Sequence, residues 1–313
     1  MQIFRHNEPL PASVRGASVA VGNFDGVHRG HQAVIGEAGR IAKAQDAPWA
    51  VLSFEPHPRA LFKPDEPPFR LTTPDAKARL IEGLGVDALI IVDFGAEFAA
   101  TPPEAFVHDV LMERLGAHHV VAGYDFAFGK GRQGNCELLL RMGQDAGFGF
   151  TAVHPVRNHS GDIFSSSLAR KALRAGDPDK AARVLGRSFE IEGVVEHGDQ
   201  RGRTIGFPTA NLNFDDVIRP KHGVYAVLAG IDEGEATVWR QGVANIGNRP
   251  TVDGKDVNLE VFLFQFDDNL YGRRLRVRLI DFIREEKKFD GLDALRAQIA
   301  LDCDTAHRIL AQV

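Results

Sequence analysis

The chain has 313 residues, more than the ~250–300 at which one hydrophobic core usually stops growing, so we expect two domains. Hydrophobic residues make up 44% and charged residues 25%, which excludes a disordered or collagen-like chain. The 37 basic and 42 acidic residues give a net charge of -5, which argues against a protein that grips nucleic acid through its overall field.

Export and membrane insertion are not indicated. The first residues lack the apolar core of a signal peptide, and the densest apolar run, 88–92, is far too short to span a bilayer. Cys136 and Cys303 are far apart and show no CxxC spacing, which fits a reducing compartment. We therefore expect a cytoplasmic protein with no nucleic-acid partner, no membrane association and no obligate protein partner.

The first half alternates short apolar runs with amphipathic stretches, which is the pattern of a parallel sheet covered by helices. Strands are expected at 18–21, 49–54, 88–94, 118–122 and 148–153. Helices are expected to begin at Thr73-Pro74, at Thr101-Pro102-Pro103-Glu104, which combines a capping box with an early proline, and at Asp177-Pro178. Helical stretches at 165–175 and 177–185 end this half.

After Gly186 the chain changes to short β-rich runs separated by glycine and proline turns. We place the boundary near residue 187, giving domains 1–187 and 188–313. Strands expected at 224–229, 238–244, 259–266 and 275–283 predict a small antiparallel barrel, and a helix at 292–310 closes the chain. The predicted fold class is α/β followed by β.

A glycine-rich motif with two histidines, GNFDGVHRGH at 22–31, follows the first expected strand and leads into a helix. Glycines let the backbone approach phosphates, a helix N-terminus attracts anions, and histidines three residues apart can face the same side. The motif predicts a triphosphate site, with ordinary turn residues as the alternative. Zinc is not expected, because no HExxH pattern or third clustered ligand accompanies His28 and His31.

The segment GKGRQG at 129–134 is formally a GxGxxG and indicates a nicotinamide dehydrogenase as an alternative. Its glycines begin several residues beyond the expected strand end, and no convincing acidic residue follows at the end of a next strand. A phosphate or flavin loop fits better. A P-loop is excluded, because Gly131 follows Lys130 where serine or threonine is needed.

In the second half, GDQRGRTIGFPTAN at 198–211 combines glycines, arginines and a Pro-Thr-Ala-Asn run. Glycines permit a tight loop around phosphates, and the Thr209 hydroxyl and Asn211 amide oxygen are hard ligands suited to Mg²⁺. The alternative is turn chemistry, since Thr and Asn often bond their own backbone.

The 22–31 motif resembles the HxGH signature of nucleotidyltransferases, specifically the adenylyltransferase half of bifunctional riboflavin kinase/FAD synthetases. The FEPHP segment at 54–58, the GYDFAFGKGRQG segment at 123–134, and Ser165-Ser166-Ser167 with Arg170 resemble further segments of that family, in the same order. Ser167 and Ala169 depart from the family's usual threonine and isoleucine. The resemblance implies a Rossmann-like fold and catalytic roles for His28, His31 and Arg170. The nucleotide- or flavin-binding residues that it implies are Gly22, Asn23, Phe24, Asp25, Gly26, Gly30, Phe54, Pro56, His57, Pro58, Asp125, Phe126, Phe128, Ser165 and Ser166.

The 198–211 segment resembles the flavokinase signature and is followed by further landmarks of that family: KHGVY at 221–225, GVANIGNRPT at 242–251, LEV at 259–261 and a charged stretch at 284–289. The resemblance implies that Glu260 is the general base and that Thr209 and Asn211 bind Mg²⁺ with ATP. Phe262 stands where many relatives carry histidine. The implied binding residues are Gly198, Arg203, Gly206, Phe207, Pro208, Asn245 and Arg284.

Together the two halves predict consecutive reactions, in which riboflavin and ATP give FMN, and FMN and ATP give FAD and pyrophosphate. The predicted ligands are riboflavin, FMN, FAD, ATP and Mg²⁺. Three alternatives stay open at this point. They are a nicotinamide-dependent oxidoreductase, a non-enzymatic flavin-binding protein, and an RNA-linked nucleotidyltransferase, which the net charge and the 8% aromatic content weaken.

Overall fold

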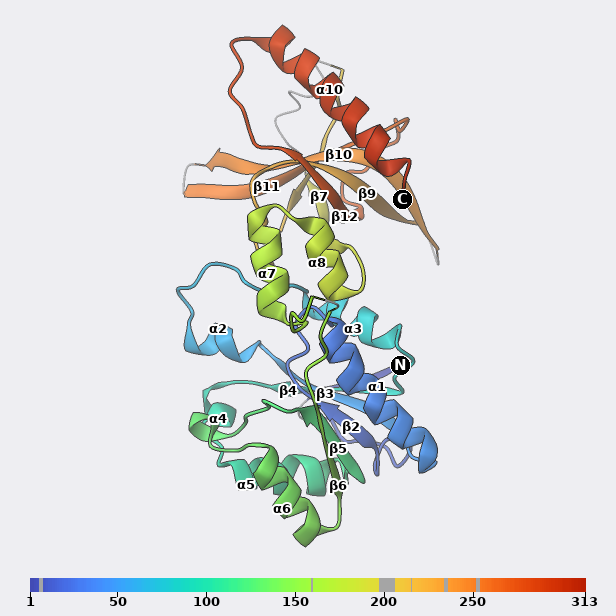
Figure 1. Ribbon diagram of the computed structural model, residues 1–313, viewed down its shortest axis with the longest axis vertical. Coiled ribbons are helices and arrows are strands. Elements are labelled where there is room, and N and C mark those ends of the chain that lie inside the picture. Colours follow the sequence, from blue (N-terminus) through green and yellow to red (C-terminus); the bar gives the residue numbers. More distant parts are fainter. Residues whose placement is uncertain (6–7, 159, 197–205, 215, 234–235, 252–253) are drawn as a thin grey trace. The chain divides into compact units, whose positions relative to one another are not determined.

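A computed structural model describes residues 1–5, 8–158, 160–196, 206–214, 216–233, 236–251 and 254–313 (Figure 1). Its internal contacts divide the chain into two compact units, 1–66 with 72–165 and 67–71 with 166–313. By these contacts the helical residues 166–185 group with the second unit. The functional boundary near residue 187 stays a prediction.

The first unit contains a six-stranded parallel sheet in the order β1-β4-β3-β2-β5-β6. Its strands are β1 (Gln2–Arg5), β2 (Ser18–Val21), β3 (Trp49–Glu55), β4 (Ala88–Asp93), β5 (His119–Gly123) and β6 (Gly149–Val153). The expected strands agree within about one residue at each end. The edge strand β1 was not expected, because its largely exposed side chains form no apolar run.

The strand order creates a switch point next to β2. The chain runs from β2 to β3 and β4 on one side and then crosses to β5 and β6 on the other. In open parallel sheets, ligands bind in the crevice outside the carboxyl ends of the strands at such a point. The loops after β2 and β5 are therefore the first place to look for a site.

Helices cover both faces of this sheet (Figure 1). On one face α1 (Arg29–Ala44) and α3 (Pro74–Glu82) bury apolar side chains such as Ile35 and Ile81 against Val51 and Leu89. On the other face η1 (Phe106–Arg114), which continues α5 (Pro103–Ala105), and α6 (Cys136–Ala146) pack against the alternate strand residues. Short helices in the loops are α2 (Pro58–Phe62), α4 (Ala96–Ala99) and η2 (Lys130–Arg132).

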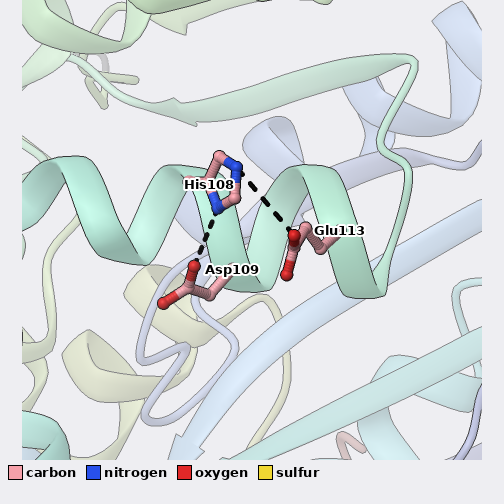
Figure 2. Close-up of side chains that lie close together, drawn as sticks. All are labelled: His108, Asp109 and Glu113. Atoms are coloured by element: carbon pink, nitrogen blue, oxygen red, sulfur yellow. Dashed lines mark hydrogen bonds and ion pairs between the residues drawn. The ribbon is translucent and has the colours of Figure 1, made fainter.

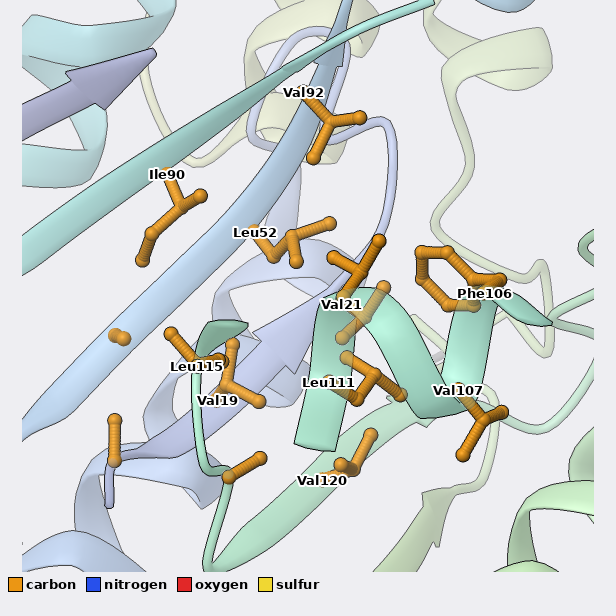
Figure 3. Packing of buried hydrophobic residues seen from close by; sticks show 14 of the residues in the cluster. Val19, Val21, Leu52, Ile90, Val92, Phe106, Val107, Leu111, Leu115 and Val120 are labelled. Carbon is orange, nitrogen blue, oxygen red and sulfur yellow. The ribbon is translucent and has the colours of Figure 1, made fainter. Parts of the chain in front are cut away.

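The segment η1 is a π-helix with two different sides. Figure 3 shows Phe106, Val107 and Leu111 from this helix packed against side chains of the sheet. Figure 2 shows its exposed residues His108, Asp109 and Glu113, where the His108 Nδ1 lies 2.8 Å from Asp109 Oδ1. Asp109 first, and also Glu113, raise the pKa of the His108 imidazole. This cluster is a surface group of ion pairs.

Two of the three predicted helix starts carry the predicted side-chain cap. Thr73 Oγ1 accepts a hydrogen bond from Ala76 N at 3.2 Å, and Asp177 Oδ1 accepts one from Lys180 N at 2.8 Å. The capping box predicted at Thr101 is wrong, because α5 begins at Pro103 with Pro102 at the cap position and no side-chain cap bond.

The second unit is a closed antiparallel barrel in the order β10-β11-β8-β7-β12-β9. Its strands are β7 (Phe189–Glu196), β8 (Ala210–Asn213), β9 (Gly223–Glu233), β10 (Ala236–Thr251), β11 (Gly254–Leu263) and β12 (Arg274–Arg284). The helices α7 (Ser166–Ala175) and α8 (Pro178–Leu185) precede it, and α8 packs against β7 and β12. The strands β7 and β8 were not among the expected strands.

Alternating residues divide the barrel wall into an inner and an outer face. Leu212, Leu259, Val261 and Val277 fill the interior. On the outer face α10 (Leu292–Leu310), which has the expected bounds, packs against β9, β10 and β12. Within the described residues, no helix combines the length and the apolar composition needed to cross a membrane.

Candidate functional site

Three of the predicted motifs follow neighbouring strands of the parallel sheet. The histidine motif follows β2, the FEPHP segment begins in β3, and the GYDFAFG segment begins at the end of β5. Because β3, β2 and β5 are adjacent and parallel, their carboxyl ends lie at the same edge. The structure thus brings these segments to the switch point of the sheet, where ligands bind in such folds.

In the histidine turn, residues 22–31, the two imidazole rings stack against each other. His28 caps α1, since its Nδ1 accepts a hydrogen bond from His31 N at 3.2 Å. The two rings stack with centroids 3.5 Å apart, and the Phe24 ring meets His31 edge-on. A Cβ at Gly30 would lie 3.0 Å from the His28 ring, a tight contact that glycine avoids. The imidazoles therefore adjoin the positive end of α1.

Buried polar groups hold the middle of the histidine turn. Asp25 is 4% exposed and accepts a hydrogen bond from Thr72 N at 3.2 Å. Gly26 N donates to Thr72 Oγ1, also at 3.2 Å, and Gly26 has a φ of 82°. Asp25 thus braces the turn, and its predicted contact with a ligand stays a prediction. Gly22 lies beside the Phe24 ring, where a Cβ would approach to 3.1 Å.

The FEPHP segment joins β3 to the short helix α2. A cis peptide bond links Glu55 to Pro56, and Pro58 is the first residue of α2. His57 Nδ1 accepts a hydrogen bond from Arg59 N at 3.1 Å and so caps this helix. His28 at the start of α1 and His57 at the start of α2 therefore both act as helix caps.

Phenylalanines form a continuous cluster at this edge of the sheet. The predicted residues Phe54, Phe126 and Phe128 belong to it. The rings of Phe126 and Phe128 stack with centroids 5.5 Å apart, and the Phe128 and Phe106 ring centroids are 5.2 Å apart. The further members are Phe62, Phe94, Phe98 and Phe106. Phe62 is 65% exposed, so the cluster runs from the core to the surface. We define these seven residues as the phenylalanine cluster.

Sequence reasoning missed four members of the phenylalanine cluster. Phe62, Phe94, Phe98 and Phe106 come from α2, the β4 end, α4 and η1, and nothing in their spacing distinguishes them from ordinary core residues. The glycines of GKGRQG also pack here. A Cβ at Gly134 would lie 2.6 Å from the Phe128 ring, and one at Gly129 would lie 2.7 Å from Pro103. Close packing, not a dinucleotide, accounts for these two glycines.

The serine segment spans the division between the two units, with Ser165 ending the first and Ser166 beginning α7. Arg170 on α7 is 8% exposed, and its Nε donates to the Phe69 carbonyl at 2.7 Å. Its guanidinium carbon lies 5.5 Å from the centroid of the Phe69 ring. Arg170 thus belongs to the second unit, and its predicted action with His28 and His31 stays a prediction.

In the barrel, strand register places the predicted kinase residues in one row. Glu260 on β11 is paired with Asn211 on β8 and with Asn245 on β10. Directly opposed residues of antiparallel strands share a face, with Cβ atoms about 4.5–5.5 Å apart. The row lies on the outer face, since Leu259 and Val261 point inward. Glu196 on β7, opposite Asn211, extends the row and was missed by sequence reasoning.

The predicted metal ligands lie beside this row. Asn211 Oδ1 accepts a hydrogen bond from Asn258 Nδ2 at 2.9 Å, and Thr209 lies just before β8. A carboxamide oxygen has two lone pairs, so this bond orients Asn211 and leaves capacity for a metal. Neutral oxygens near a carboxylate suit Mg²⁺.

An apolar surface adjoins the row. The Phe207 ring meets Phe262 edge-on at 5.3 Å, and Phe262 contacts Phe264 at 5.9 Å. The residue before Phe207, Gly206, has a φ of 89°, and Pro208 follows. Phe262 therefore packs between two aromatic neighbours. Gly198 and Arg203 lie outside the described residues.

Arg284, predicted to bind flavin, makes a bidentate ion pair with Asp302 on α10. Its Nε and Nη2 lie 2.8 and 2.7 Å from the two carboxylate oxygens, and Gln298 Nε2 also donates to Asp302 at 3.0 Å. Asp302 is 3% exposed. The pair joins the end of β12 to the last helix.

We expect Asp302→Leu to lower the free energy of unfolding of the second unit by about 3–5 kcal/mol, because Arg284 would lose its buried partner. Urea unfolding would be followed by Trp239 fluorescence in a Trp49→Phe background. Adding Arg284→Met should restore most of the loss. If the loss of unfolding free energy in the double variant equalled the sum of the losses in the two single variants, the two residues would not be coupled.

Comparisons with known proteins match each half of the chain to a different family. The FAD synthetase family model matches residues 10–167, and the riboflavin kinase family model matches residues 185–310. The bifunctional riboflavin kinase/FMN adenylyltransferase of Escherichia coli (strain K12) is 42% identical over 296 residues, covering 94% of this chain and 93% of the relative. The Bacillus subtilis (strain 168) protein of the same name is 40% identical over 300 residues, with the same coverage.

A solved structure shows the same fold. It is described as a macrolide-efflux protein from Streptococcus pneumoniae, and it matches with a TM-score of 0.84 at 30% identity, covering 96% of this chain and 97% of that chain. The family matches leave the nicotinamide-dependent oxidoreductase and the non-enzymatic flavin carrier without support. The chain therefore belongs to the family of bifunctional riboflavin kinase/FMN adenylyltransferases, and it phosphorylates riboflavin to FMN and adenylylates FMN to FAD, with ATP as co-substrate.

Proposed function

We propose that FMN adenylylation takes place at the histidine turn of the first unit and riboflavin phosphorylation at the Glu260 row of the barrel. The observation that carries the assignment is that residues far apart in sequence lie close together in each unit. Motifs far apart in sequence meet at the switch point of the sheet, and strand register aligns Glu260 with Asn211 and Asn245. The corresponding functional domains are 1–187 and 188–313.

Adenylyl transfer needs no general base, because the FMN phosphate is already an anionic nucleophile near neutral pH. Its oxygen attacks the α-phosphorus of ATP, a new P–O bond forms, and pyrophosphate leaves. Catalysis therefore consists of alignment and stabilisation of charge on the α-phosphate and the leaving group. The stacked imidazoles of His28 and His31 and the N-terminus of α1 serve this role.

We assign the flavin ring of FMN to the phenylalanine cluster. Phe62 exposes 65% of its surface and lies 6.1 Å from Phe94, which in turn contacts Phe54 and Phe98. A flat, largely apolar ring gains both burial and stacking energy against such a surface. The FEPHP segment joins this cluster to the histidine turn, so the phosphate end of FMN would approach the imidazoles.

Riboflavin phosphorylation needs a base, because the attacking group is a hydroxyl that must lose its proton. Glu260 is a carboxylate at the centre of the row, paired with both Asn211 and Asn245, and its exposure leaves it accessible to a substrate. Asn245 and Arg284 lie on the same outer row and are proposed to bind the flavin. Bound Mg²⁺, held by Thr209 and Asn211, would neutralise charge on the transferred phosphoryl group.

We further propose that the protein works in the cytoplasm, supported by its two free cysteines. Its substrates riboflavin, FMN and ATP and its product FAD follow from the two activities. The net charge of -5 supports the proposal that nucleic acid is not among its partners.

The magnesium assignment can be tested on Asn211→Ala. We expect the Mg²⁺ concentration for half-maximal FMN formation to rise at least about tenfold, while the value for adenylylation of supplied FMN stays unchanged. Asn213→Ala, at the exposed end of β8, is the matched control and should resemble the unmodified protein. An unchanged Mg²⁺ requirement in Asn211→Ala would remove this residue from the metal site.

A further inference from the structure

A lysine outside every predicted motif lies buried beneath the histidine turn. Lys77, on α3, is 4% exposed. Its Nζ lies 2.6 Å from Glu55 Oε1, 3.0 Å from Ser53 Oγ and 3.3 Å from the Asn23 carbonyl oxygen. These three contacts match the three N–H donors of an ammonium group. Lys77 is therefore fully engaged by the protein and is not available to grip a phosphate.

The partners of Lys77 lie in the histidine turn and at the carboxyl end of β3, next to the predicted histidines. Asn23 is the second residue of the histidine turn, and Ser53 Oγ also donates to its carbonyl at 3.2 Å. Glu55 directly precedes Pro56 and His57 in the FEPHP segment. Lys77 thus joins the loop after β2 to the carboxyl end of β3, from which the FEPHP segment continues.

A second contact from the same part of the chain supports this arrangement. Thr72, just before α3, holds Asp25 and Gly26 by hydrogen bonds of 3.2 Å each. The segment 72–77 therefore braces the histidine turn at two points, residue 23 and residues 25–26. Phe24 lies between them with a φ of 49°, and Val27 has a φ of 40°. Positive φ values are strained for these side chains, so the turn needs such external support.

Fold stability alone does not account for a buried ion pair at this position. Taking two charges out of water is costly, and well-packed apolar side chains often serve a fold equally well or better. What an apolar pair cannot supply is a charged donor aimed at the Asn23 carbonyl. We propose that Lys77 is a positioning residue for FMN adenylylation, which fixes the histidine turn through Asn23 and the FEPHP segment through Glu55. This inference rests on the proposed assignment of adenylyl transfer to the histidine turn.

The proposal predicts that substitutions of Lys77 affect the rate of FAD formation and the free energy of unfolding independently. In the full-length Lys77→Met protein, we expect kcat for FAD formation from supplied FMN to fall about 10- to 100-fold, because misplacement of reacting groups by about 1 Å costs up to that much. The KM for ATP should change less than threefold, since an interaction that acts in the transition state affects kcat. FMN formation from riboflavin, measured in the same sample, should stay unchanged.

A double variant distinguishes positioning from stability. Lys77→Met with Glu55→Leu removes both buried charges, so the free energy of unfolding should recover relative to either single variant. The kcat for FAD formation should remain low, because the charged Lys77 donor to the Asn23 carbonyl is still missing and only the neutral Ser53 hydroxyl remains. If Lys77→Met alone does not fold, the double variant supplies the kinetic measurement. Lys43→Met, an exposed lysine on α1, is the matched control and should retain full activity.

Two results would overturn the proposal. One is a kcat for FAD formation within threefold of the unmodified protein in a folded Lys77→Met variant. The other is a kcat that recovers together with stability in the double variant, since Lys77 would then act only through folding. The site assignment itself is tested separately. If His28→Ala left FAD formation unchanged, the histidine turn would not be the adenylyltransferase site, whatever Lys77→Met showed.

Discussion

Replacing His28 by alanine is expected to lower kcat for FAD formation from FMN about 100- to 1,000-fold, the usual cost of losing one preorganised group that stabilises transition-state charge. The same effect is expected for His31→Ala, because the two rings stack at 3.5 Å and adjoin the start of α1. FMN formation from riboflavin should be unaffected. Both products would be separated by chromatography and quantified over time.

His28 also caps α1, so loss of stability must be separated from loss of chemistry. Removing a cap costs about 0.5–2 kcal/mol, whereas asparagine is itself a good cap residue. His28→Asn should therefore unfold at nearly the same temperature as the unmodified protein and still form FAD slowly. His108→Ala replaces an exposed histidine of η1 and is the matched control. Full FAD formation by folded His28→Ala and His31→Ala proteins would contradict the assignment.

For the barrel, Glu260→Gln is expected to lower kcat for FMN formation about 100- to 10,000-fold, the range attributed to a general base. The side chain keeps its size and loses its ability to accept the proton of the riboflavin hydroxyl. FAD formation must be tested with FMN supplied directly, and we expect it to be unchanged.

The control for Glu260 makes the same chemical change elsewhere on the barrel. Asp267→Asn alters an exposed carboxylate just beyond β11 and should leave both reactions intact. Circular dichroism would establish that the variants are folded. If folded Glu260→Gln also lost adenylylation of supplied FMN, the two reactions would not occupy separate sites.

Much of the architecture could be predicted because local signals agree with the fold. In the first half, apolar runs bounded by turn residues identify the strands that the sheet buries, and the same holds for β9 to β12 in the barrel. The edge strand β1 has only exposed or half-buried side chains, and β8 has four residues, so neither leaves a strong pattern. The Thr101 capping box failed because Pro102 takes the cap position.

Grouping of the residues into sites was decided by tertiary structure. Glu260 and Asn211 are 49 positions apart in sequence and meet only through the register of β11 with β8. A slip of one residue in that register would turn Glu260 into the barrel interior. The same dependence explains Asp302, which meets Arg284 only because α10 folds back onto the barrel.

The sequence by itself determined which residue types are present for phosphate, flavin and metal chemistry, and in which order they follow along the chain. Glycine, histidine and Pro-Thr-Ala-Asn motifs can be identified in this way because they carry local backbone and ligand properties. Tertiary structure alone decided which groups support them. Lys77 resembles any helical lysine until α3 packs against the ends of β2 and β3, where the cost of burying its charge is offset by Glu55, Ser53 and the Asn23 carbonyl. Burial and partnership are properties of the packed chain, because they depend on residues that sequence spacing does not bring together.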